Sequence, residues 1–295
     1  MIWRIALAVL AILIAGAVGM YYFVEPPRIL SWVDAVAGGG RGTEEVATAV
    51  PFGTTGQTLD VWRPAGDHPT TSRPVLIFYY GGGWVHGDRG AYAFAARAYA
   101  KAGFVVVVPD YRKVPSVRFP AFLQDAAEAV KWTRDNIAGY GGDPTRIATA
   151  GHSAGGYAAI MLPMDPHWLT AIGVDPHIIK AAVGLCGPYD FFPYDKKRSI
   201  DAFKGVVDGP ATQPIHYARA GLAPMMLVTA SNDTQVRPYN AVNLTKALKK
   251  AGSPVEFREY QGLSHEDVAM ALSVPFRGKA PALSDSVSFL KRVLK

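Results

Sequence analysis

Short apolar runs alternate with amphipathic segments along most of the chain. The run from Phe104 to Val108 (FVVVV) is too continuous for a strand with one wet face, so we expect a sheet that is covered on both sides. Similar runs predict strands at 58–62, 74–80, 146–150, 180–185, 224–229 and 255–260. The amphipathic segments predict helices at 91–102, 119–137, 154–161, 238–251 and 283–294. This alternation is typical of an α/β fold, in which a mostly parallel twisted sheet has helices on both faces and its chemistry at the carboxyl ends of the strands.

The amino-terminal region has a different hydropathy pattern. Residues 5–24 form 20 consecutive positions without a charge, and at about 1.5 Å per residue they would span about 30 Å of hydrocarbon. Arg4 precedes the run, so residues 1–27 are predicted to be a signal anchor or transmembrane helix, with the rest of the chain on the extracytoplasmic side. The alternative is a secreted or periplasmic protein cleaved near residues 15–17, but an aromatic cluster continues the run at 21–23 and favours the anchor.

The remaining chain shows one linker and then a uniform composition. Glycines at 38–40 and 42 interrupt any periodicity, so residues 28–45 are predicted to be a tether and residues 46–295 a single domain. With 49% hydrophobic residues the chain is not disordered, and its one cysteine excludes an internal disulfide and a cysteine-rich zinc module. The net charge of +6 is scattered rather than clustered, which argues against nucleic-acid binding.

Residues 151–155 (GHSAG) match a G-x-S-x-G motif between a predicted strand and a predicted helix. In that context a sharp turn lifts the Ser153 hydroxyl clear of the sheet, and the helix amino terminus favours negative charge nearby. The alternative is a glycine-rich turn with a capping serine. We predict that Ser153 is a nucleophile.

A serine nucleophile needs a base and an acid, which follow it along the chain in this fold class. His265 is the histidine that lies beyond the last predicted strand, and Asp233 lies in the exit turn of the strand before it. Asp233 would orient the His265 imidazole and stabilise its charged form. Asp190 is a weaker second candidate, because an aspartate in a Pro-Tyr-Asp turn more often caps a loop.

Residues 80–84 (YGGGW) follow another predicted strand. Consecutive glycines let backbone N–H groups approach a substrate oxygen, so we predict an oxyanion hole formed by the N–H groups of Gly82, Gly83 and Ala154. A phosphate-binding loop is excluded because the segment lacks the Lys-Ser/Thr ending of a P-loop.

Together these motifs resemble the α/β-hydrolase superfamily, in particular microbial carboxylesterases of the HGGGW type and feruloyl-esterase-like or kynurenine-formamidase-like hydrolases. The resemblance covers residues 50–290 and rests also on residues 110–112 (DYR) and 142–147 (GDPTRI). Tyr80 departs from it, because the family usually has histidine there to brace the glycine loop. The resemblance implies an α/β-hydrolase fold, an acyl pocket lined by Trp84, and no need of a metal or organic cofactor.

The expected function is therefore hydrolysis of carboxylic esters through a Ser-Asp-His triad and an acyl-enzyme intermediate. An insert at 189–217, beginning with Tyr189, is rich in aromatic residues and is predicted to form a small cap. These aromatics suit a small to medium, apolar or aromatic ester, or they serve only to pack the cap. Two alternatives remain: an amidase, arylformamidase or peptidase with the same triad, and a non-catalytic, membrane-anchored binding protein on a hydrolase scaffold.

Overall fold

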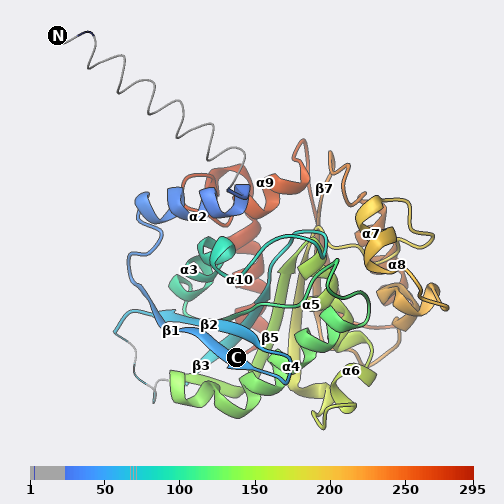
Figure 1. Cartoon of the computed structure of the whole chain (residues 1–295), viewed down its shortest axis with the longest axis horizontal. Helices are drawn as coiled ribbons and strands as arrows, with labels where there is room; N and C mark the ends of the chain where they lie inside the picture. The colour runs from blue at the N-terminus through green and yellow to red at the C-terminus, as the bar shows by residue number, and fades with distance from the viewer. Residues whose placement is uncertain (1–2, 4–23, 67, 69, 71) are drawn as a thin grey trace.

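An eight-stranded sheet forms the centre of the computed structural model, which describes residue 3 and residues 24–295 except 67, 69 and 71 (Figure 1). The strand order is β1-β2-β4-β3-β5-β6-β7-β8, in which β1 and β2 are antiparallel to their neighbours and β3 to β8 run parallel. The strands are β1 (Thr43–Phe52), β2 (Gln57–Pro64), β3 (Arg73–Tyr79), β4 (Val105–Pro109), β5 (Gly142–His152), β6 (Ile179–Leu185), β7 (Met225–Ala230) and β8 (Val255–Tyr260). The predicted mostly parallel sheet is confirmed.

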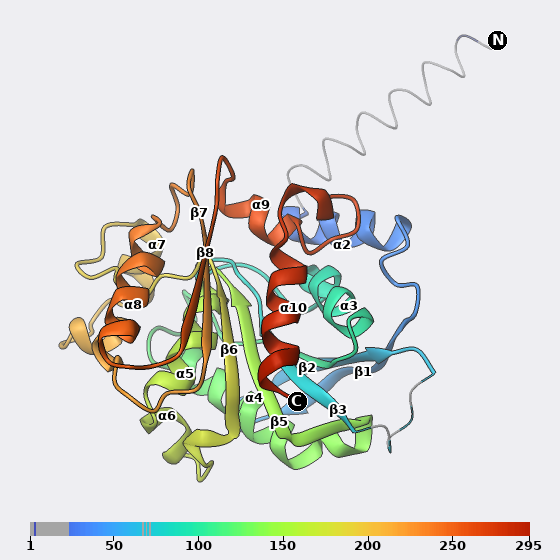
Figure 2. The same cartoon turned by 180° about the vertical axis from the view of Figure 1, so that it is seen from behind.

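Helices cover both faces of this sheet, as predicted. On one face α3 (Ala93–Lys101) and α10 (Ala282–Val293) pack against each other and against the strands (Figure 2). The opposite face carries α4 (Ala121–Asn136), α5 (Ala154–Met164) and α8 (Tyr239–Lys250). Every residue of β4 is buried between these layers, which explains its continuous apolar sequence.

The shorter helices lie in the connections. They are α2 (Pro26–Val36), α6 (His167–Thr170), α7 (Lys197–Ala202), α9 (His265–Met270), and the 3₁₀ turns η2 (Gly90–Tyr92), η3 (Ile137–Tyr140), η4 (Pro176–Ile178), η5 (Pro210–Thr212), η6 (Pro214–Tyr217) and η7 (Arg277–Lys279). The turns η5 and η6 and helix α7 belong to the insert at 189–217.

The segment predicted to be a tether, residues 28–45, is folded instead. Helix α2 lies at the top of the molecule in Figure 1, and β1 begins at Thr43. Asp34 of α2 is buried, forms an ion pair of 2.8 Å with Arg97 of α3, and accepts a 2.8 Å hydrogen bond from the Val274 N–H. A buried carboxylate with two partners fixes the helix to the domain, and Gly38, at φ +87°, ends the helix rather than opening a linker.

Of the predicted anchor, residues 1–27, the structure describes residue 3 and residues 24–27, and it places Pro26 and Pro27 in helix α2 instead; the rest of the anchor lies outside the described residues. No helix in the described part of the chain is long and apolar enough to cross a membrane.

Candidate active site

Ser153 occupies a strained turn between β5 and α5. Its backbone has φ +56° and ψ −122°, a conformation that residues other than glycine rarely adopt. The Ser153 N–H donates a 2.9 Å hydrogen bond to the Leu185 carbonyl, which holds the turn against β6. A Cβ at Gly155 would lie 2.1 Å from the Tyr79 carbonyl oxygen, so only glycine permits helix α5 to begin this close to β3. The turn presents Ser153 to a cavity of about 1150 Å³ at the carboxyl end of the sheet.

Asp233 and His265 are joined by a short hydrogen bond. His265 Nδ1 lies 2.6 Å from Asp233 Oδ2, and both side chains are buried. The other carboxylate oxygen, Asp233 Oδ1, accepts the N–H groups of Gln235 at 2.9 Å and Val236 at 2.8 Å. These bonds fix the carboxylate with one oxygen toward the imidazole. Asp190, the second candidate acid, accepts a hydrogen bond of 2.7 Å from Asn243 and, within the described part of the chain, forms no hydrogen bond with His265.

His265 is the first residue of helix α9 rather than part of a loop. Ser264 caps this helix: its side chain accepts the Asp267 N–H, while Asp267 Oδ2 accepts the Ser264 N–H at 3.0 Å. Lys279 pairs with the same carboxylate at 2.6 Å, and this pairing lowers the pKa of Asp267 to about 2. The capping box therefore fixes the backbone that carries His265.

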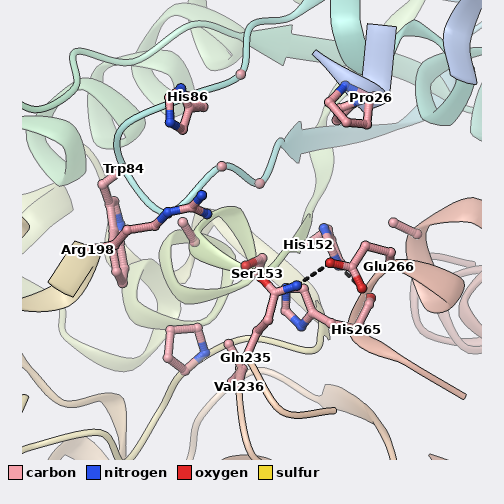
Figure 3. A pocket seen from close by; sticks show the side chains of 18 of the residues that line it. Pro26, Trp84, His86, His152, Ser153, Arg198, Gln235, Val236, His265 and Glu266 are labelled. Carbon is pink, nitrogen blue, oxygen red and sulfur yellow. Dashed lines mark hydrogen bonds between the residues drawn. The ribbon is translucent and has the colours of Figure 1, made fainter. Parts of the chain in front are cut away.

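Ser153 and His265 line the same cavity and lie near each other in Figure 3. Between these two described side chains the structure contains no hydrogen bond. Such bonds are often long before substrate binds and shorten in the substrate complex. The arrangement thus brings the predicted nucleophile, base and acid to one place.

The glycine loop, residues 80–84, forms part of the cavity wall close to Ser153. Gly82 has φ +136°, and a Cβ on it would lie 2.2 Å from the His86 carbonyl oxygen, so this turn requires glycine. Gly82, Gly83 and Ala154 all line the cavity beside Ser153. Their assignment as oxyanion donors stays a prediction.

Tyr80, the first residue of the glycine loop, is buried and fixes the loop through contacts of its hydroxyl and its ring. Its hydroxyl donates a 3.0 Å hydrogen bond to Asp110 and accepts one of 2.9 Å from Lys113, while its ring stacks on Tyr111 at 4.6 Å. Asp110 also accepts from the Arg89 backbone and side chain. Tyrosine therefore supplies a polar anchor at the position where the resembling family has histidine.

His152, next to the predicted nucleophile, lines the cavity and also packs its ring against His265. The two ring centroids are 4.7 Å apart, and His152 Nε2 lies 3.1 Å from the His265 carbonyl oxygen. Its Nδ1 lies 3.2 Å from the Tyr92 hydroxyl. Burial, together with repulsion from His265, lowers the pKa of His152 to about 3, so this imidazole is neutral at physiological pH.

Cys186 lies beside the acid, a contact that the sequence does not reveal. Ligand atoms of Cys186, Asp233 and His265 all lie within 4.8 Å of one another, which is close enough for a metal site. Burial and the neighbouring carboxylate, however, raise the pKa of the Cys186 thiol well above its usual value, and a protonated thiol is a poor ligand. His265 Nδ1 is already bonded to Asp233. The cluster is therefore better explained as an acid–base pair with a buried thiol.

The two residues predicted to bind substrate differ in their positions. Trp84 lines the cavity, although most of its ring is buried against Phe122, Phe191 and Phe203. Tyr189 is fully buried and is not a lining residue: its ring packs in the core beneath the insert, with its hydroxyl close to Gly184. A side chain a few residues after a strand end can turn into the core or toward the site, and the sequence pattern does not distinguish the two.

Helix α2 contributes lining residues that the sequence interpretation missed. Ile29, Leu30 and Val33 form an apolar part of the cavity wall, and Pro26 lies across the cavity from Trp84 (Figure 3). The signal that could have identified this helix is the proline pair at positions 26 and 27, because proline is favoured in the first turn of a helix.

A parallel sheet with a serine at a strained strand-to-helix turn and a histidine after the last strand defines the α/β-hydrolase class. Within that class, the chain belongs to the BD-FAE family, whose model matches residues 59–248.

Individual relatives agree with this assignment. The carboxylesterase NlhH of Mycobacterium tuberculosis is 32% identical over 75% of this chain and 74% of its own length. Esterase LipC of the same species is 32% identical over 71% of this chain, which spans only 56% of that relative. Among solved structures, Thermogutta terrifontis esterase 2 phosphorylated by paraoxon is 25% identical, with a TM-score of 0.68 over 86% of this chain and 95% of the other.

Proposed function

We propose that this protein hydrolyses carboxylic esters with Ser153 as nucleophile, His265 as general base and acid, and Asp233 as the partner that orients the imidazole. The observation that carries the proposal is the 2.6 Å bond between His265 and Asp233 in the cavity that holds Ser153. Esterase relatives and a solved esterase of the same fold support the ester as substrate.

In the proposed reaction the Ser153 hydroxyl attacks the ester carbonyl carbon while His265 Nε2 takes its proton. With Asp233 Oδ2 as the acceptor of the Nδ1 hydrogen, the free electron pair of the neutral imidazole is on Nε2, the atom that takes the serine proton in this proposal. The tetrahedral oxyanion would be stabilised by the N–H groups of Gly82, Gly83 and Ala154. His265 then protonates the leaving alcohol, and water cleaves the Ser153 acyl-enzyme by the same steps in reverse.

The cavity indicates the general kind of ester. The helix α2 side chains and Trp84 give an apolar wall, which suits a small to medium acyl or aryl group. Phe191 also lines the cavity, whereas Phe203 and Tyr194 pack behind it. We infer that most aromatics of the insert hold the cap together and that few of them contact substrate.

The test is a matched panel of p-nitrophenyl esters and p-nitroanilides that share the same acyl groups, from acetyl to octanoyl, assayed with the full chain in mild detergent. We expect ester hydrolysis with kcat/KM of about 10⁴ M⁻¹ s⁻¹ or more, and much slower cleavage of the anilides. Faster cleavage of anilides or formanilides would replace the esterase proposal by the amidase alternative. Absence of turnover with every substrate would favour the non-catalytic binding protein.

We also propose that the uncharged run at residues 5–24 anchors the enzyme in a membrane, with the hydrolase domain on the extracytoplasmic side. The support is the uncharged run at 5–24 after Arg4. We expect the full chain to fractionate with membranes, to resist extraction by high salt, and to retain residue 1 or 2 as its mature amino terminus in mass spectrometry. A mature protein that starts at Val18 would show signal cleavage and contradict the anchor.

A further inference from the structure

Two guanidinium groups in the active-site cavity have no partner in the described structure. Arg198 of helix α7 and Arg237, in the loop after Asp233, both line the cavity that holds Ser153 and His265. Neither side chain forms a hydrogen bond or ion pair with any residue that the structure describes. By contrast, Arg28 and Arg89, which lie near the same end of the sheet, are paired with aspartates at 2.5 Å and 2.6 Å. Both residues are exposed, and both line the cavity, so their guanidinium groups can be reached by a ligand bound there.

Arg198 is positioned by the glycine loop itself. A Cβ on Gly83 would lie 2.6 Å from Arg198 Cδ, so the aliphatic part of the arginine rests on the space where a larger residue would have a side chain. Figure 3 shows the Arg198 side chain running past Trp84, with its guanidinium pointing toward the middle of the cavity. The positive charge thus lies on the cap side of the predicted oxyanion donors.

The carboxylates of the cavity do not neutralise these groups. Glu25, on the α2 side, accepts the Gly87 N–H at 3.0 Å and lies 3.5 Å from His86. Glu266, on α9, accepts a hydrogen bond from the Gln235 side chain. The hydrogen bonds to both carboxylates come from neutral donors, so Glu25 and Glu266 keep their charges, but they lie on the side of the cavity formed by α2 and α9.

On the cap side the balance of charge is positive. Positions 195–198 have the sequence Asp-Lys-Lys-Arg, and all four residues line the cavity together with Arg237. Lys197 is paired at 2.8 Å with Asp201, which does not line the cavity. Asp195 is the one acid among the other four side chains, so basic groups exceed acidic ones by two there. The cavity therefore has apolar side chains and the Glu25 carboxylate on the α2 side, the Glu266 carboxylate on α9, and an excess of basic side chains at the cap.

We propose that the preferred substrate is an ester that bears a second, anionic group, a carboxylate, which Arg198 and Arg237 bind while the ester carbonyl lies at Ser153. This inference rests on the proposed esterase function. A guanidinium can bind a carboxylate through two parallel hydrogen bonds, and such charge-assisted bonds are stronger than neutral ones. The apolar wall formed by α2 would take the remaining hydrocarbon part of the molecule.

The test compares two pairs of substrates that differ only in this charge. On the acyl side the pair is the p-nitrophenyl half-ester of adipic acid and its methyl ester; on the alcohol side it is 4-carboxyphenyl butyrate and its methyl ester. We expect kcat/KM to be about tenfold higher for the acid in at least one pair, mainly through a lower KM, with the advantage shrinking as salt is added. Uncatalysed hydrolysis is subtracted in each case.

Variants connect this preference to the arginines. Arg198→Gln is expected to lower the acid-to-methyl-ester ratio about tenfold, and Arg198→Glu to reverse the preference. Arg118→Gln is the matched control, because Arg118 is exposed and does not line the cavity; it should leave the ratio unchanged. Labelling of each variant by paraoxon at wild-type stoichiometry checks that the site is folded.

The outcomes separate this inference from the function on which it rests. If all four esters are hydrolysed, but the ratio is one or less in both pairs or does not respond to Arg198→Gln, the anion site is wrong and the esterase proposal stands. If none of the esters is hydrolysed and paraoxon does not label the wild-type chain, the esterase proposal itself fails.

Discussion

Replacement of Ser153 by alanine is expected to lower kcat for ester hydrolysis by about 10⁶-fold, because the attacking oxygen is removed and no other group can form the acyl-enzyme. The same change should abolish covalent labelling by paraoxon, the reagent that phosphorylates the structurally similar Thermogutta esterase. Binding of substrate should change little, since the cavity walls formed by α2 and the cap remain. Steady-state kinetics and intact-protein mass spectrometry measure the two effects.

Ser116→Ala is the matched control for this variant. Ser116 is exposed and lies outside the cavity, so its loss should leave both kcat and labelling at wild-type levels. Labelling of Ser153→Ala at the wild-type rate would show that another residue is the nucleophile. A far-ultraviolet circular dichroism spectrum equal to that of the wild type excludes unfolding as the cause of lost activity.

The sheet and the convergence of the candidate catalytic residues were predictable because both depend on local signals. Buried central strands such as β4 need continuous β-branched residues, and that pattern is visible in any short window. In a parallel sheet the carboxyl ends of successive strands meet at one edge, so residues that follow strands at 153, 233 and 265 come together through topology alone. The convergence of these three positions follows from the strand order and does not depend on how side chains pack.

Strand β1 and helix α2 were missed because their stability comes from distant partners. Strand β1 is an edge strand in which every residue except Phe52 is half-exposed or exposed, and it has two register irregularities against β2, so it lacks a clean alternation. Helix α2 depends on the ion pair between Asp34 and Arg97, which are 63 positions apart in the chain. A sequence window around either residue shows only one half of that interaction.

Side-chain direction limited the prediction of the pocket. Trp84 and Tyr189 both follow strands as aromatics, yet one contacts the cavity and the other fills the core. The place of Arg198 over Gly83 is equally invisible in the sequence, because helix α7 and the glycine loop are brought together only by the folded cap. These contacts decide specificity, whereas the local motifs decide the class of chemistry.

Replacement of Asp233 by asparagine is expected to lower kcat about 10⁴-fold while KM changes little. In the wild type, Asp233 Oδ1 accepts two backbone N–H groups and Oδ2 faces His265. An asparagine would place its carbonyl oxygen at the two N–H groups and its amide nitrogen against His265 Nδ1. Since that nitrogen is a donor, the imidazole would carry its hydrogen on Nε2 and could no longer accept the proton of Ser153.

The matched control is Asp190→Asn, which makes the same chemical change at the other candidate acid. Asp190 accepts a hydrogen bond from Asn243, which the asparagine carbonyl oxygen can still accept, and no contact joins Asp190 to His265 in the described structure, so kcat should stay within about a factor of two of wild type. Paraoxon labelling should be slowed strongly by Asp233→Asn, since formation of the covalent bond needs the same base, but should still reach one label per chain after long incubation. A larger loss of kcat in Asp190→Asn than in Asp233→Asn would assign the acid to Asp190 and remove the tautomer argument.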